Sequence, residues 1–158
     1  NPGMAAPTLL VGHSLGGAAV LAAASHIPSI RAVATLGAPY APSHVTHLFD
    51  EHLDTLQARG EATLRLGGAK PLRITQALIE DLERYGCPAY LSRLKQALLI
   101  LHSPLDAVVG IENARRIFEH ARHPKSFVAL PDTDHLLSKP AQARYAARLI
   151  AAWAAAYV

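Results

Sequence analysis

Short apolar runs alternate along this sequence with longer segments of helical periodicity, and this alternation limits the fold more than any other feature. The runs cover residues 8–11, 31–36, 97–101 and 126–130. Such short, mostly apolar runs are typical of strands buried in a parallel sheet. Three of them are followed directly by a helical pattern, over residues 15–26, 112–121 and 141–158. The order predicts an α/β fold with a parallel sheet and right-handed crossovers.

Residues 40–95 interrupt this alternation, and we expect them to form an insertion. Apolar residues at helical spacing predict one helix that ends at Gly60 and another that ends at Gly86. Two short alternating segments, joined by Gly67-Gly68, predict a β-hairpin between the helices. A helix–hairpin–helix insertion of this kind is predicted to act as a lid over a substrate site.

Length and composition favour one domain over residues 1–158 and exclude several classes of protein. The composition of 51% apolar and 17% charged residues excludes a disordered chain and most coiled coils. No stretch reaches the roughly 20 uninterrupted apolar residues of a membrane span. The 15 basic residues are scattered and aromatic residues make up only 6%, which argues against a nucleic-acid surface. The single cysteine, Cys87, excludes an intrachain disulfide and a cysteine-based metal site, and favours a reducing compartment such as the cytoplasm.

The segment Gly-His-Ser-Leu-Gly-Gly (12–17) lies between the first predicted strand and the first predicted helix. It contains the pattern G-x-S-x-G, in which the serine occupies a strained turn that projects its hydroxyl above the sheet. Gly12 and Gly16 are expected to let the strand and the helix approach closely. Ser14 is therefore the candidate nucleophile, and the backbone N–H of Leu15 is the candidate oxyanion donor. The alternative is a glycine-rich turn with an inert serine; a phosphate-binding loop is excluded by the glycine spacing and the missing lysine.

A nucleophilic serine needs a base, and the base needs an acid that orients it. Asp106 and His135 each follow a predicted strand, at the end of a parallel sheet where ligands bind. The chain order serine, aspartate, histidine is one of the known orders of a catalytic triad. Asp132 and Asp134 are alternative acids, but they share the loop of His135 and would have to fold back onto its ring. Asp106 is therefore the preferred acid and His135 the base for Ser14.

Two further histidines lie next to these residues in the sequence. We expect the side chain of His13, directly before the serine, to turn into the packing behind the turn. His102 ends the strand that precedes the candidate acid, where it can hydrogen-bond within the site.

The sequence resembles the α/β-hydrolase superfamily. It is similar in particular to the hydrolase half of bacterial proteins that fuse an α/β-hydrolase to an OsmC-like peroxidase domain. The resemblance is carried by residues 12–24, 36–39, 102–114, 121–128 and 134–138. The motif around Ser14 is shared by the wide superfamily, whereas residues 102–114 and 121–128 carry the narrower similarity. The resemblance implies Ser14 as nucleophile, Asp106 as acid and His135 as base, with residues 40–95 as the lid.

The resemblance also implies what these 158 residues lack. A complete sheet of this family has about eight strands, and the chain begins at the strand before the nucleophile. The first strands, and the loop that gives a second oxyanion N–H, are therefore expected in a missing N-terminal half. The chain has no OsmC-like domain and no second cysteine, so the peroxidase chemistry of the fusions is not expected.

These observations favour a serine hydrolase of the carboxylesterase kind, which cleaves carboxylic ester or thioester bonds without a metal or organic cofactor. The alternatives are an acyltransferase or perhydrolase on the same triad, and a catalytically silent fragment that assembles with another chain. The expected partner is a small-molecule acyl ester. Binding to nucleic acid or to a membrane is not expected. A homodimer, or association with the missing N-terminal half, is an alternative way to complete the sheet. Five apolar residues of the insertion either favour an apolar acyl group or pack onto the sheet: Leu48, Phe49, Leu78, Ile79 and Leu82.

Overall fold

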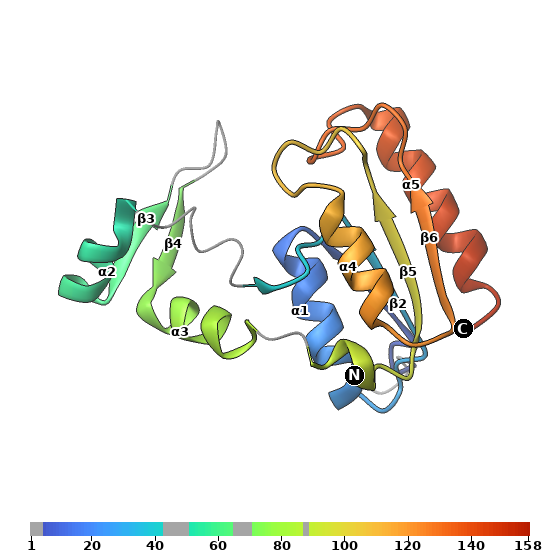
Figure 1. Ribbon diagram of the computed structural model, residues 1–158, viewed down its shortest axis with the longest axis horizontal. Helices are drawn as coiled ribbons and strands as arrows, with labels where there is room; N and C mark the ends of the chain where they lie inside the picture. Colours follow the sequence, from blue (N-terminus) through green and yellow to red (C-terminus); the bar gives the residue numbers. More distant parts are fainter. Residues whose placement is uncertain (1–4, 43–50, 65–70, 87–88) are drawn as a thin grey trace. The chain divides into compact units, whose positions relative to one another are not determined.

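The computed structural model describes residues 5–42, 51–64, 71–86 and 89–158. The chain forms two compact units: residues 1–40 together with 88–158, and residues 41–87 (Figure 1). The first unit contains a four-stranded parallel sheet in the order β1-β2-β5-β6. Its strands are β1 (Leu9–His13), β2 (Ala32–Leu36), β5 (Ala97–His102) and β6 (Lys125–Ala129). The predicted parallel α/β sheet is thus confirmed.

Three helices cover the two faces of this sheet. In Figure 1, α1 and α4 lie on one face and α5 lies on the other. The helices are α1 (Leu15–Ala23), α4 (Glu112–His120) and α5 (Pro140–Ala154), with short 3₁₀ turns at Ala24–His26 and Leu91–Arg93. The predicted helices are therefore present. The first is completed by a 3₁₀ turn, and the last ends four residues earlier than its periodicity suggests. No helix in the described part of the chain combines the length and the apolarity that a membrane crossing needs.

The core explains why the strands show no polar alternation. Ala34, Leu36, Leu99 and Leu101 are buried in one cluster with residues of α5, such as Ile150. Successive strand residues point to opposite faces. Their buried neighbours Val33, Leu98 and Ile100 therefore face the side on which α1 and α4 lie. Both faces of β2 and β5 are covered, so both sets of side chains are apolar.

The strand β1 is less buried than the neighbouring strand β2. Val11 is 48% exposed, whereas every residue of β2 is buried. Among the described residues, β1 pairs only with β2, so its other edge has no strand beside it. A strand with one unpaired edge leaves its side chains and its backbone N–H and C=O groups open on that side.

The second unit contains two helices and an antiparallel pair of strands. They are α2 (Leu53–Arg59), β3 (Glu61–Leu64), β4 (Leu72–Thr75) and α3 (Gln76–Arg84). Gly60 ends α2 in a left-handed conformation with φ 73°, as the sequence predicts. Its carbonyl accepts a 3.0 Å hydrogen bond from the backbone N–H of Gln76, which joins the two helix ends. The predicted order of helix, hairpin strands and helix is present.

Some predictions for this unit lie outside the described residues. These are the predictions for the hairpin turn at Gly67 and Gly68, for Leu48 and Phe49 in the first helix, and for Cys87. Of the other apolar positions proposed for the insertion, Ile79 and Leu82 are buried.

Small residues let β1 and α1 approach closely, but not the pair that the sequence suggests. A Cβ added to Gly12 would overlap the backbone of Gly16 and Gly17, and one added to Gly17 would lie 2.5 Å from the Cβ of Ala38. A Cβ added to Gly16 meets no described atom within 4 Å. The expectation that Gly16 makes room for the strand is therefore wrong, because a side chain at Gly16 would point into open space; Gly12 and Gly17 fill that role.

This difference predicts opposite effects of two matched substitutions. Gly12→Ala forces backbone atoms apart and should lower the free energy of unfolding by about 1–3 kcal/mol. Gly16→Ala should leave it unchanged or raise it by up to about 1 kcal/mol, because alanine favours a helix. Urea denaturation of both variants checks this, and equal stabilities for the two variants would contradict it.

Candidate active site

Ser14 lies in the sharp turn between β1 and α1. Its backbone has φ 54° and ψ −129°, a conformation that costs a non-glycine residue about 1–3 kcal/mol. The turn is fastened to the neighbouring strand, since the N–H of Ser14 donates to the carbonyl of Leu36 at 2.8 Å. The carbonyl of Ser14 accepts from the N–H of Gly17 at 2.8 Å. The strained turn expected from the motif is present, and local hydrogen bonds hold it.

His135 brings a base to this serine from the loop between β6 and α5. Its Nε2 lies 2.9 Å from the Oγ of Ser14, and its Nδ1 lies 2.8 Å from Oδ2 of Asp106. A carboxylate only accepts hydrogen bonds, so the partners assign the proton to Nδ1. Nε2 is then free to accept the proton of the serine hydroxyl.

Asp106 is held from both of its oxygens. Oδ1 accepts hydrogen bonds from the backbone N–H groups of Val108 and Val109, each at 2.9 Å, and Oδ2 accepts from His135. Burial alone would raise the pKa of Asp106, but the hydrogen bonds from His135, Val109 and Val108 outweigh it and bring the pKa below its ordinary value. The carboxylate is therefore ionised at neutral pH.

The two alternative acids have other partners. Oδ1 of Asp134 accepts from the backbone N–H of Ser138 at 2.8 Å, and this bond, with others, lowers the pKa of Asp134. Asp132 has φ 48°, and its carbonyl accepts from the side-chain amide of Gln142. Both residues shape the loop that carries the base, whereas Asp106 contacts its ring.

Gly37 is a residue of this site that the sequence analysis did not identify. It follows β2 and has φ 53°, and a Cβ there would lie 3.0 Å from Oδ2 of Asp106 and 3.3 Å from Nδ1 of His135. A larger residue would press on the hydrogen bond between the acid and the base. The signal in the sequence is a glycine directly after a buried strand, but the contact it protects depends on loops that are distant in the chain.

His13 differs from its expected position. Instead of turning behind the elbow, its ring is exposed and lies 4.9 Å from the ring of His135, centroid to centroid. Its Nε2 lies 2.7 Å from the backbone carbonyl oxygen of His135, to which it donates. The expectation was wrong because the side chain of His13 finds a polar partner in the loop of the base.

The proposed oxyanion donor lies at the start of a helix. Leu15 is the first residue of α1, and the first N–H groups of a helix have no acceptor within it. The Leu15 N–H is thus not used by the hydrogen bonds of the helix, and the positive end of the helix dipole lies at the same place. These two properties suit the binding of a negative oxygen next to Ser14.

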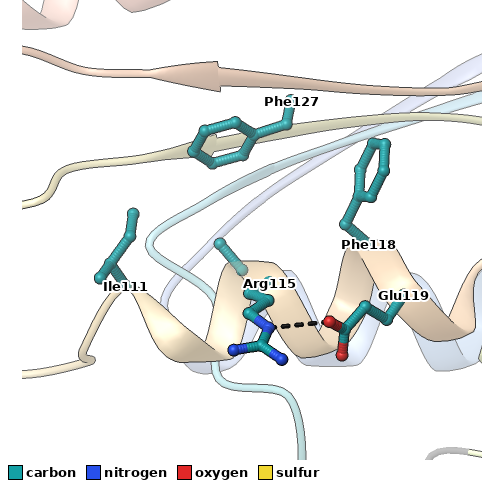
Figure 2. Close-up of a pocket in the computed structure, with 6 residues that line it drawn as sticks. Ile111, Arg115, Phe118, Glu119 and Phe127 are labelled. Carbon is teal, nitrogen blue, oxygen red and sulfur yellow. Dashed lines mark hydrogen bonds and ion pairs between the residues drawn. The ribbon is translucent and has the colours of Figure 1, made fainter.

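An open, mostly apolar pocket lies elsewhere on the first unit, between α4 and β6. Figure 2 shows Phe127 of β6 across from Arg115 and Phe118 of α4 and from Ile111, the residue before that helix. Arg115 pairs with Glu119 at 2.7 Å along the exposed side of the helix. No residue of the hydrogen-bonded chain from Asp106 to Ser14 lines this pocket. Among the described residues there is also no group of three or more His, Cys, Asp or Glu that could hold a metal ion.

Of the comparisons with known proteins, the one with solved structures agrees with this architecture. No protein-family model matches the sequence, and no curated protein matches it. Among solved structures, the esterase domain of a Rhodothermus marinus protein is 50% identical, with a TM-score of 0.83; the match covers 96% of this chain and 62% of that one.

More distant structures share the fold alone. The mouse α/β hydrolase domain-containing protein 10 is 20% identical, with a TM-score of 0.67, over 97% of this chain and 64% of that one. A monoacylglycerol lipase from Paleococcus ferrophilus is 21% identical, with a TM-score of 0.61, over 92% and 66%. The chain spans less than two thirds of the length of each of these structures. The parallel sheet, its flanking helices and these similarities together show that the chain has the α/β-hydrolase fold.

Proposed function

We propose that this protein is a serine hydrolase that cleaves carboxylic ester or thioester bonds through an acyl-enzyme. The observation that carries the proposal is the hydrogen-bonded chain from Asp106 through His135 to Ser14, with contacts of 2.8 and 2.9 Å. The chain contains an ionised acid, a base with the correct nitrogen free and a hydroxyl on a strained turn. This arrangement activates a serine for attack on an acyl carbonyl.

In the proposed reaction, Ser14 Oγ forms a bond to the carbonyl carbon while Nε2 of His135 takes the hydroxyl proton. Asp106 holds the imidazole in this tautomer and stabilises the imidazolium that forms. The N–H of Leu15 binds the negative oxygen of the tetrahedral intermediate. The intermediate then collapses, and His135 gives its proton to the leaving alcohol or thiol. Water, activated by the same base, releases the acid from the acyl-enzyme.

The esterase domain that is 50% identical to this chain supports an ester as the substrate. Because the match spans 62% of that domain, the activity remains a proposal for this chain. We also propose a cytoplasmic location, which the single cysteine supports. We further propose that the protein is related to the hydrolase half of the OsmC-like fusions, on the similarity of residues 102–114 and 121–128. Association with a second copy of the chain, or with a further segment, is also a proposal.

A comparison of two aspartates tests the proposed mechanism. Asp106→Asn should lower kcat for a p-nitrophenyl ester by about 10⁴-fold, because an amide at this place favours the wrong imidazole tautomer. Asp134→Asn is the matched control, since its carboxylate binds a backbone N–H in the loop of the base, and it should cause a much smaller loss. If Asp134→Asn shows the large loss and Asp106→Asn the small one, the assignment of the acid is wrong.

The lowered pKa of Asp106 predicts a pH dependence of stability. The folded state holds this proton less tightly than the unfolded chain, so ionised Asp106 contributes its full stability above the unfolded pKa of about 3.9. The contribution is lost as the pH falls through the lower, folded pKa. Urea denaturation between about pH 6 and pH 3 should therefore show a smaller acid-induced loss in Asp106→Asn than in the wild type. Asp132→Asn is the control; a wild-type slope in Asp106→Asn would contradict the prediction.

We also propose that residues 40–95 form the substrate-covering insertion. The compact unit of residues 41–87 supports this, because a separate unit of this size interrupts the β–α alternation of the sheet. Deleting residues 60–74 should change KM and acyl preference more than it changes the melting temperature. A control variant, Arg73→Gln, breaks only an exposed ion pair with Glu61 and should change neither. A deletion that yields only unfolded protein would contradict the lid.

A further inference from the structure

One buried titratable side chain lies against the proposed catalytic chain without a part in its chemistry. His102 is the last residue of β5 and is 0% exposed. Its Nε2 lies 2.8 Å from the carbonyl oxygen of Val109 and 3.7 Å from Oδ2 of Asp106. A polar ring in such a place needs an explanation, because an apolar residue would fill the same volume without a polar group to bury.

The partners of the ring define how it acts. The carbonyl of Val109 can only accept, so Nε2 of His102 carries the proton that it donates. The other ring nitrogen, Nδ1, has no hydrogen-bond partner among the described residues. The ring therefore acts through a single hydrogen bond, and that bond goes to a residue of the acid loop.

This bond links the rigid sheet to the residues that hold the acid. The backbone of His102 is fixed at the end of the sheet, where its carbonyl accepts from the N–H of Leu130 at 2.9 Å. Val109, at the other end of the bond, is 1% exposed, and its own N–H donates to Oδ1 of Asp106 at 2.9 Å. Loss of the ring donor would leave a buried carbonyl unpaired and would free Val109 to move away from the carboxylate.

We propose that His102 is a positioning residue that fixes Val109, so that the N–H groups of Val108 and Val109 orient the carboxylate of Asp106 toward His135. His102 touches neither Ser14 nor a reacting atom. The inference rests on the proposed hydrolase function, but the contact that it controls, between Asp106 and His135, can be measured without turnover.

Two substitutions separate this role from simple core packing. The amide nitrogen of glutamine can take the place of Nε2, so His102→Gln should keep the bond to Val109. His102→Leu fills a similar volume but cannot donate. With a short activated ester, His102→Leu should lower kcat by about 10- to 100-fold, as expected for a misplaced catalytic group, with KM nearly unchanged. His102→Gln should restore most of kcat.

Proton NMR gives a second measurement that needs no substrate. The Nδ1–H proton that His135 shares with Asp106 should give a far-downfield resonance in the wild type and in His102→Gln. The resonance should be lost or shifted in His102→Leu. If the leucine variant does not fold, His102→Asn replaces it, because the shorter amide does not reach the carbonyl of Val109.

The possible results are distinct. A leucine variant with wild-type kcat and an unchanged resonance overturns the proposal. So does a loss of kcat that is equal in the leucine and glutamine variants and follows their loss of thermal stability, since packing alone would explain it. A wild type that shows the resonance but hydrolyses no ester contradicts the proposed function instead, and the NMR comparison of the variants still decides the role of His102.

Discussion

The parallel direction of the strands is the constraint on which the candidate site depends. Because β1, β5 and β6 run in one direction, their carboxyl ends lie at the same edge of the sheet. The turn of Ser14 follows β1, the loop of Asp106 follows β5 and the loop of His135 follows β6. His135 therefore hydrogen-bonds to Ser14, which lies 121 residues away in the chain, and to Asp106, which lies 29 residues away. Apolar burial on both faces of β2 and β5 keeps this edge in place.

Glycine then sets how closely the parts of the site meet. No side chain fits at Gly12 or Gly17, because β1, α1 and Ala38 pack closely there. This close packing keeps the serine turn tight. Gly37 leaves the space in which Asp106 and His135 form their bond. Close backbone packing on one side, and the loops of the acid and the base on the other, thus hold the serine turn in its strained conformation.

The sequence predicts those features that depend on local pattern. The apolar runs predict the four parallel strands, and the motif around Ser14 predicts the strained turn. Asp106 and His135 were chosen by residue type and chain order. They lie within hydrogen-bonding distance of each other, and His135 also lies within hydrogen-bonding distance of Ser14. Features that depend on a partner distant in the chain were wrong or missing, namely the roles of individual glycine and histidine residues. The position of the His13 ring is set by a carbonyl 122 residues away, which no local pattern encodes.

The central claim is that His135 activates Ser14, and the most direct test is covalent labelling of the purified protein with a fluorophosphonate, followed by mass spectrometry of its peptides. We expect one adduct, on Ser14, and a labelling rate that falls by orders of magnitude in His135→Ala. Ser138→Ala, in the loop that follows the base, is the control and should react at the wild-type rate. An adduct on another residue, or a His135→Ala variant that is labelled as fast as the wild type, would contradict the activation of Ser14 by His135.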